Sequence, residues 1–389
     1  MKKLLYCLLL LTIISCGEKK RTGGHTGNTT AEEPAEQSGD FYRRYGGTIA
    51  GQPVVVHLQR SGNTLSGTYY YTRQGKAISL SNSEDTTNDE NYLLTEIPPG
   101  GGSDGYAHWY LEPEGGKLNG KWTSADGKKE YPVILTEQYP AGSYRLQVKY
   151  YEASQTLVEG RKEPAAAFTA AYITPGTSVG AEDADFILSV IKKELGCDTI
   201  SSDVDACIRK SADAYLQDYR NGLADMDTAD ISSPINNYSS DRSLRVTYND
   251  DGILVMEDFI ADYSGGAHGN YSSSYICADV KGHRVWKLED ILTVDSSIMK
   301  PMLDIAARDY FGLGLHDALE NRMLVEEVPV TGNVFISGKG ISFVYNPYEI
   351  ASFADGMVVL FLSYEKLKPL LTPAFIARMH LFAAGSGAA

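Results

Sequence analysis

The chain has 389 residues, of which 43% are hydrophobic and 22% are charged, and its formal net charge is −15. These values are ordinary for a globular protein, and the length allows two or three domains. The negative charge disfavours nucleic acid and other anionic polymers as partners, whereas it would attract a cationic protein. Solubility alone is the alternative explanation of the acidity.

The N-terminus is typical of a bacterial lipoprotein signal. Two lysines precede a short apolar run that ends at Ile13-Ile-Ser-Cys16. The run is too short to span a bilayer comfortably, and a small residue before the cysteine fits lipoprotein cleavage. We predict that residues 1–15 are removed and that an acyl chain such as palmitate on Cys16 anchors the protein to the membrane. A plain signal peptide with an incidental cysteine is the alternative.

The residues after Cys16 bear on location and on tethering. Residue 17 is Gly rather than the Asp that retains lipoproteins in the inner membrane, which favours the outer membrane of the cell envelope. Residues 16–41 are rich in Gly, Thr, Glu and Lys and contain no apolar period. They are expected to form a flexible tether.

Residues 42–138 alternate between apolar and polar side chains and are interrupted by Gly, Asn and Asp at regular spacing. This pattern predicts an all-β domain, a small antiparallel barrel with a meander like that of lipocalins or avidin. Strands are expected at about 44–50, 53–59, 64–72, 76–80, 91–96, 106–111, 117–123 and 130–136.

Four aromatic residues of these strands could stack on sugar rings at a barrel mouth, and they are Tyr69, Tyr71, Trp109 and Trp122. Such rings would bind a glycan or peptidoglycan. The alternative is that they point inward and fill a barrel that is too narrow for a cavity.

Residues 143–262 change character and predict an α+β region. Strands are expected at 144–150 and 165–172, and helical spacing of apolar residues follows at 182–195 and 203–219. A hairpin is expected from strands 243–249 and 252–263 around the turn Asn249-Asp-Asp-Gly252. Cys197 and Cys207 are a candidate disulfide across the helix connection, because export would bring the chain into an oxidising compartment.

Two further blocks contain unusual residue combinations, Tyr263-Ser-Gly-Gly-Ala-His-Gly-Asn270 and Phe343-Val-Tyr-Asn-Pro-Tyr-Glu-Ile-Ala-Ser-Phe-Ala-Asp-Gly356. In the first, three glycines surround one histidine, so a hairpin corner can adopt left-handed backbone geometry at little steric cost. Taken alone, this block predicts an exposed turn and says nothing about a ligand.

Together the two blocks resemble the extracytoplasmic domain of RsiV-like anti-sigma factors, which sense lysozyme by binding it. The preceding helices and hairpin resemble the small domain found in PdaC-type peptidoglycan deacetylases. The resemblance covers about residues 145–371, with an RsiV-like domain at 263–371 and a C-terminal tail at 372–389. It implies a C-terminal antiparallel sheet with packed helices, and it implies lysozyme or another basic protein as partner. No transmembrane helix or cytoplasmic sigma-binding segment is evident, so signalling by proteolysis is not expected.

The resemblance implies a ligand surface built mainly on the second block. Pro347 fixes its own φ and biases the preceding residue away from helix, which predicts a preordered loop. The alternative for Tyr348 is that it packs under the sheet as core. The residues expected at this surface are His268, Asn346, Pro347, Tyr348, Phe353 and Asp355.

No residue set predicts catalysis or a cofactor. Asp262, Ser264 and His268 look like a triad, but three groups on one strand and turn do not generally converge as nucleophile, base and orienting group. No Cys/His spacing typical of a metal site occurs. We expect a non-enzymatic envelope lipoprotein that binds a cationic protein. A glycan-binding or scaffold lipoprotein that uses the β domain is the alternative, and an unrecognised hydrolase is the third reading.

Overall fold

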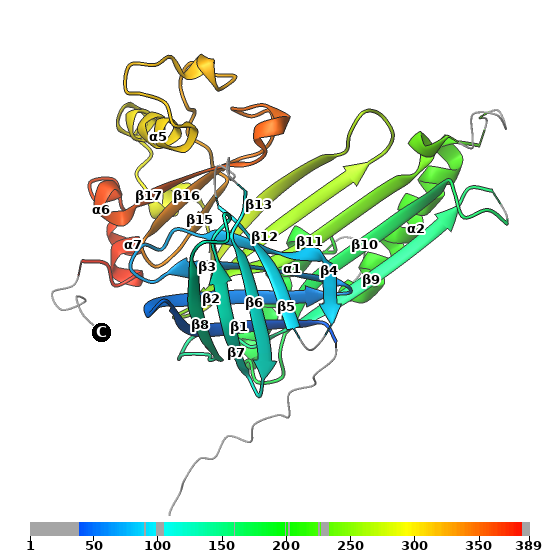
Figure 1. Ribbon diagram of the computed structural model, residues 1–389, viewed down its shortest axis with the longest axis horizontal. Helices are drawn as coiled ribbons and strands as arrows, with labels where there is room; N and C mark the ends of the chain where they lie inside the picture. The colour runs from blue at the N-terminus through cyan, green and yellow to red at the C-terminus, as the bar shows by residue number, and fades with distance from the viewer. Residues whose placement is uncertain are drawn as a thin grey trace, which may run out of the picture. The chain divides into compact units, whose positions relative to one another are not determined.

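The computed structural model describes residues 39–88, 91–98, 105–158, 160–198, 200, 203–224, 226 and 233–382. The expected signal peptide, Cys16 and almost all of the expected tether lie outside the described residues. Figure 1 shows the order of the elements along the described chain.

The N-terminal region is a closed eight-stranded antiparallel barrel, as the alternating pattern predicted. Each strand pairs with the next one along the chain, and β1 closes the barrel by pairing with β8 (Figure 1). The strands are β1 (Phe41–Ile49), β2 (Gln52–Ser61), β3 (Thr64–Tyr71), β4 (Ile78–Asn88), β5 (Asn91–Ile97), β6 (His108–Glu114), β7 (Lys117–Thr123) and β8 (Glu130–Glu137).

Large side chains fill the interior of this barrel, because alternate residues of each strand point inward. The buried set is apolar apart from its tyrosine hydroxyl groups and the Trp109 indole N–H, and it includes Tyr45, Leu58, Tyr69, Leu94, Trp109, Leu111, Leu118 and Leu135. Two glycines allow neighbouring strands to approach closely. A Cβ atom would lie 2.3 Å from the carbonyl oxygen of His57 at Gly67, and 1.9 Å from that of Tyr110 at Gly120.

A six-stranded sheet follows, in the order β14-β13-β12-β11-β10-β9. Its strands are β9 (Leu146–Thr156), β10 (Ala165–Pro175), β11 (Tyr238–Asp250), β12 (Ile253–Tyr263), β13 (Asn270–Asp279) and β14 (Arg284–Trp286). All neighbours are antiparallel except β10 and β11, which are parallel. The expected boundary at residue 263 therefore lies between two neighbouring strands of one sheet.

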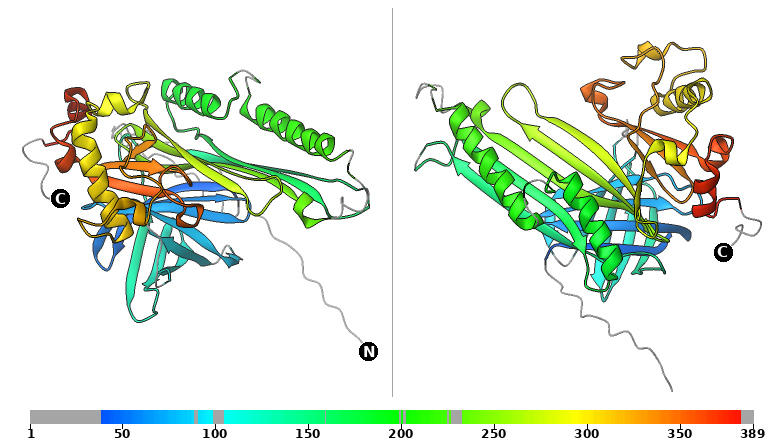
Figure 2. Two further views of the ribbon diagram at one scale, coloured as in Figure 1. Left: turned by 90° about the horizontal axis from the view of Figure 1, so that it is seen from above. Right: turned by 180° about the vertical axis from the view of Figure 1, so that it is seen from behind.

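A helical connection joins the two parallel strands, as parallel pairing requires a crossover. It contains α1 (Ala181–Glu194), α2 (Val204–Gly222) and the short 3-10 turn η1 (Pro234–Asn236). Both long helices cover one face of the sheet (Figure 2). Asp203 caps α2 by accepting a hydrogen bond from the backbone of Asp205, and Cys197 and Cys207 are disulfide-bonded.

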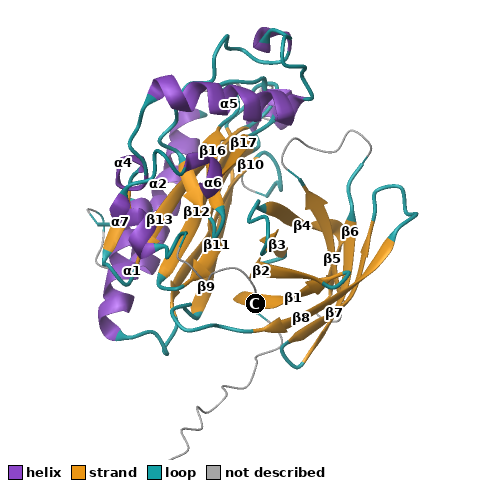
Figure 3. Ribbon diagram, turned by 90° about the vertical axis from the view of Figure 1, so that its left-hand side faces the viewer, coloured by secondary structure: helices purple, strands orange, loops and turns teal. Residues whose placement is uncertain are grey.

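The C-terminal part adds a three-stranded antiparallel sheet, β15 (Val334–Ile336), β16 (Gly340–Tyr345) and β17 (Val358–Ser363). Its helical elements are α4 (Leu288–Ile291), α5 (Ser296–Phe311), α6 (Tyr364–Leu367) and α7 (Pro373–Arg378), with 3-10 turns η2 (Leu319–Asn321) and η3 (Phe353–Asp355). Figure 3 shows these helices beside the strands. Residues 372–382, the described part of the expected C-terminal tail, are not a simple tail. They begin with α7, because Phe375 is buried in the core against Trp286.

Two asparagine side chains attach the small sheet to the edge of β13. Asn346 Oδ1 accepts from the backbone N–H of Ser273 at 2.8 Å, and Asn346 Nδ2 donates to the Ser273 carbonyl at 3.3 Å. Asn333 Oδ1 accepts from the N–H of Tyr275 at 3.1 Å, and its Nδ2 donates to the same Ser273 carbonyl at 2.8 Å. These side-chain amides occupy backbone groups that a neighbouring strand would otherwise pair, because β14 pairs only with residues 277–279.

A buried polar cluster connects the barrel with the six-stranded sheet. Arg44 of β1 donates from Nε to the carbonyl oxygen of Asn249 at 2.9 Å. The Asn249 amide, fully buried, donates to the Tyr42 hydroxyl at 3.1 Å and to the Tyr144 carbonyl at 2.7 Å. Because buried polar groups are costly unless they are hydrogen-bonded, these residues specify how β1 meets β11.

Candidate functional site

Two loops that are distant in the sequence meet through their aromatic side chains. One loop, residues 264–269, connects β12 and β13, and the other, residues 346–357, connects β16 and β17. The ring of His268 stacks on Phe353 with 4.1 Å between ring centroids and 23° between planes. Tyr348 lies 5.9 Å from Phe353, and Tyr271 contacts Phe353 edge-on at 5.6 Å. We call these four residues and Phe259, whose ring is 6.0 Å from that of Tyr271, the two-loop aromatic surface.

The glycines of the first loop place His268 at this surface. Gly265 and Gly266 have φ values of 93° and 100°, a region that side-chain-bearing residues seldom adopt. The Tyr263 hydroxyl donates to the Gly266 carbonyl at 3.1 Å and fixes the corner. His268 Nδ1 lies 2.7 Å from the carbonyl oxygen of Gly269, and because a carbonyl only accepts, Nδ1 carries the proton. The histidine is thus exposed and oriented by its own turn.

Asn346 and Pro347 belong to the support of the second loop rather than to its outer surface. The Asn346 amide is used on the backbone of Ser273, and Pro347 is buried. The backbone N–H of Asn346 also donates to Glu349 Oε2 at 3.0 Å. The fold therefore places Asn346 and Pro347 in the support of the loop, and a ligand contact by either residue stays a prediction.

Asp355 also supports the loop. Its Oδ2 accepts from the backbone N–H of Ser352 at 3.2 Å and from the Ser352 hydroxyl at 2.5 Å. Its Oδ1 lies 3.2 Å from Arg322 Nη2. This arrangement caps η3, the turn that contains Phe353. Asp355 thus fixes the position of Phe353.

Tyr348 is presented to solvent by a strained turn. Its φ is +70°, and its side chain is 55% exposed, so it is not the core residue that the alternative predicted. The turn is closed by the hydrogen bond from Tyr348 N–H to the Ala351 carbonyl at 3.0 Å. A left-handed conformation costs a non-glycine residue about 1 to 3 kcal/mol, and such strain concentrates at functional sites.

Charged groups flank the two-loop aromatic surface. Arg245 lies over the face of Phe259, with its guanidinium carbon 4.7 Å from the ring centroid, and its Nε is 3.3 Å from Glu257 Oε2. Glu349 and Asp262 are exposed beside the second and first loops respectively. Thus the arginine charge is already engaged by a ring and a carboxylate, while two acidic side chains face solvent.

Residues 290–365 match the family model DUF3298, which is described as a protein of unknown function. Residues 290–365 form a DUF3298 domain. No curated protein matches the chain. The crystal structure of a DUF3298 family member from Bacteroides fragilis is 23% identical, with a TM-score of 0.55 over 61% of this chain and 98% of that chain. A DUF3298 family protein from Pseudomonas aeruginosa is 16% identical, with a TM-score of 0.43 over 59% of this chain and 96% of that one.

The first of these two likenesses supports the fold, and neither supplies a function. The second loop, with Tyr348 and Phe353, belongs to the DUF3298 domain, whereas the loop of His268 precedes it. The two-loop aromatic surface is therefore shared between the DUF3298 domain and the larger sheet. The resemblance to RsiV-like and PdaC-type domains stays a prediction.

The four aromatic residues expected to bind sugar lie in the barrel, outside the DUF3298 domain. Two of them are buried in its interior and two line a cavity at one end. Tyr69 is 1% exposed and Trp109 is fully buried, with their rings in edge contact at 4.8 Å. Sugar stacking therefore does not hold for Tyr69 and Trp109, which fill the barrel as the alternative predicted. Tyr71 and Trp122 are half-buried and line a cavity of about 360 Å³ at one barrel end.

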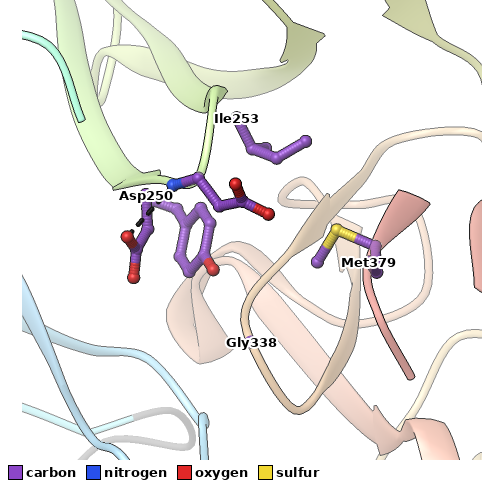
Figure 4. Close-up of a pocket in the computed structure, with 6 residues that line it drawn as sticks. Asp250, Ile253, Gly338 and Met379 are labelled. Atoms are coloured by element: carbon purple, nitrogen blue, oxygen red, sulfur yellow. Dashed lines mark hydrogen bonds between the residues drawn. The ribbon is translucent and has the colours of Figure 1, made fainter. Parts of the chain in front are cut away.

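A smaller cavity of about 190 Å³ lies between the sheet and the C-terminal elements (Figure 4). Its acidic side chains, Asp250 and Asp251, have basic partners at 3.6 Å in Arg44 and 3.3 Å in Arg378. It is best explained as part of the packing between elements. Within the described ranges, no group of three or more His, Cys, Asp or Glu residues could hold a metal ion. None of the helices there is long and apolar enough to cross a membrane.

The sequence analysis missed residues of both the two-loop aromatic surface and the barrel. Tyr271 and Phe259 extend the two-loop aromatic surface. Their signal was their position on the paired strands β12 and β13, beside the glycine-rich block. In the barrel, Glu96 accepts from the indole N–H of Trp109 at 3.2 Å and of Trp122 at 2.7 Å. No spacing in the sequence brings Glu96 to these two residues, because the three side chains come from three strands.

Proposed function

We propose that the protein is a non-catalytic lipoprotein of the cell envelope that binds a basic protein at the two-loop aromatic surface. Lysozyme is the specific candidate, on the strength of the resemblance to RsiV-like domains. The observation that carries this proposal is the stack of His268 on Phe353, which joins both unusual sequence blocks into one exposed feature.

The geometry favours a binding role because the aromatic side chains are already ordered. Asn346 and Asp355 hold the second loop from below, and a strained turn directs Tyr348 outward. An interface loses less conformational entropy when its anchors are fixed before binding, and aromatic residues are the commonest anchors.

The charge of the chain suits a basic partner. The net charge is −15, and Glu349 and Asp262 are exposed at the two loops. Opposite net charges accelerate encounter, and the acceleration falls as salt screens the interaction. Binding by this mechanism should therefore weaken with ionic strength, while the aromatic contacts retain part of the affinity.

The test is calorimetric titration of the full chain with lysozyme at moderate salt. Phe353→Ala and Tyr348→Ala should each weaken binding by about 2 kcal/mol, roughly 30-fold, if these rings are anchors. Tyr106→Ala is the matched control, because Tyr106 is 40% exposed but lies in the barrel. Absence of binding at micromolar protein, or equal effects of all three substitutions, contradicts the proposal.

Envelope attachment is a separate part of the proposal, and its support is the sequence Ile13-Ile-Ser-Cys16. Metabolic labelling with a palmitate analogue should mark the wild-type chain and not the Cys16→Ser variant. Equal labelling of both would reject the anchor without affecting the binding proposal. Glycan binding by the barrel is less favoured than the sequence alone suggested, because Tyr69 and Trp109 are buried.

A further inference from the structure

One end of the barrel contains a cavity that the proposed function does not use. Its volume is about 360 Å³, close to the lower end of the range for small-molecule sites. The barrel below is filled by Tyr69 and Trp109, so the cavity ends there and does not continue as a channel. Six of the nine residues that line it have aromatic or polar side chains, and they are Gln52, Tyr71, Arg73, Gln74, Trp122 and Tyr131.

The aromatic wall of this cavity is held in a fixed orientation. Trp122 donates its indole N–H to Glu96 Oε2 at 2.7 Å, and its ring stacks on Tyr131 with 5.5 Å between centroids. The same carboxylate oxygen accepts from Trp109 at 3.2 Å. Trp122 is therefore oriented by a hydrogen bond at one edge and by a ring on one side, which preorganises it for a flat ligand.

The polar groups of the lining favour an anion. Arg73 is exposed in the turn between β3 and β4, and it is the one charged side chain among the nine lining residues, all of which are described. Gln52 and Gln74 add amide donors. Burial, and then the negative charge of Glu96, raise the pKa of Tyr71, so its hydroxyl stays protonated.

We propose that this barrel mouth binds a small ring-bearing anion. The ring lies against Trp122 and Tyr71, and the carboxylate or sulfonate group is bound by the Arg73 guanidinium. Glu96 positions Trp122 from below and does not contact the ligand. This site is independent of the two-loop aromatic surface, and either proposal can fail without the other.

A pair of fluorescent probes separates the ring from the charge. 8-Anilinonaphthalene-1-sulfonate is a ring-bearing anion, and N-phenyl-1-naphthylamine has the same rings without the sulfonate. The full chain should bind the sulfonate with saturation at one equivalent, at least about tenfold more tightly than the neutral probe, because a charge-assisted hydrogen bond is a strong one.

Two charge-removing variants locate the site. Arg73→Gln should weaken binding of the anionic probe at least about tenfold and leave the affinity for the neutral probe unchanged, because only the charge-assisted contact is lost. Lys117→Gln is the matched control, since Lys117 is also exposed but is the first residue of β7 and does not line the cavity. Equal binding of both probes by the wild type, or equal sulfonate affinity in Arg73→Gln and wild type, overturns the proposal. Melting temperatures show that each variant is folded.

Discussion

The attachment of the small sheet to β13 allows a prediction that depends on counting hydrogen bonds. Asn346 accepts a hydrogen bond from the backbone N–H of Ser273, and Asn333 accepts one from the backbone N–H of Tyr275. Both asparagines also donate to the carbonyl of Ser273. Substituting either asparagine with Ala removes one N–H partner but leaves the Ser273 carbonyl one amide donor. Substituting both removes both donors.

The magnitudes follow from this arrangement. Ser273 is 2% exposed, so its N–H has little access to water when Asn346 is replaced. A buried unsatisfied backbone group costs about 1 to 3 kcal/mol, and a lost secondary bond to an already satisfied carbonyl costs about 0.5 to 1 kcal/mol. We expect each single substitution to lower the free energy of unfolding by about 2 to 3 kcal/mol. In the double variant an unsatisfied carbonyl, at about 2 kcal/mol, replaces two secondary losses of about 1.5 kcal/mol together, so the double variant should lose about 0.5 kcal/mol more than the sum.

Urea denaturation of the wild type, the two single variants and the double variant gives the coupling free energy directly. Hydrogen exchange of the segment 270–279 reports the same effect locally, because the two N–H groups should lose protection in their own variants. Strict additivity, or unchanged exchange of this segment in Asn346→Ala, would refute the reasoning.

Two more predictions concern the disulfide and a buried histidine. Replacing Cys197 and Cys207 with Ala should destabilise the protein by about 3 kcal/mol, because the bond joins residues separated by 10 positions, and an unchanged urea midpoint would contradict this. Burial, and then the charge of Arg44, lower the pKa of His57 to about 3. A folded pKa below the unfolded value means that stability is lost as pH falls below about 6.5, by about 1.4 kcal/mol per pH unit, until pH approaches the folded pKa. His57→Gln should show a shallower loss of stability across this range, and identical slopes would exclude the effect.

The barrel was predictable because its information is local. Alternation of side chains and turn residues between strands indicated all eight strands, and the closed barrel confirms that prediction. Helical spacing likewise indicated α1 and α2. The candidate site could be predicted only in part. The pairing of His268 with Phe353 lay within the two blocks quoted from the sequence, but their stacking required the fold.

The failures have a common physical cause, which is that side-chain roles depend on partners from other strands. Asn346 looked like a loop residue available to a ligand, yet its amide is used by β13. Trp109 and Trp122 have similar strand patterns, but the first points into the filled centre of the barrel and the second lies at its mouth. The region after residue 371 has too short a helical period to be recognised, although Phe375 is a core residue.

The parallel pairing of β10 with β11 has a consequence for the order of folding. Every other neighbouring pair in the six-stranded sheet can form as a hairpin between consecutive strands, whereas Ala165 meets Asn237 across a separation of 72 residues. Closing a long loop costs entropy before the contacts that it allows can stabilise the chain. The β10–β11 pairing should therefore form last and determine the folding rate. The Cys197–Cys207 bond lies inside the loop and shortens its effective length. A chain that forms this disulfide early therefore has less distance to search, so the redox state during folding should affect how fast the whole sheet forms.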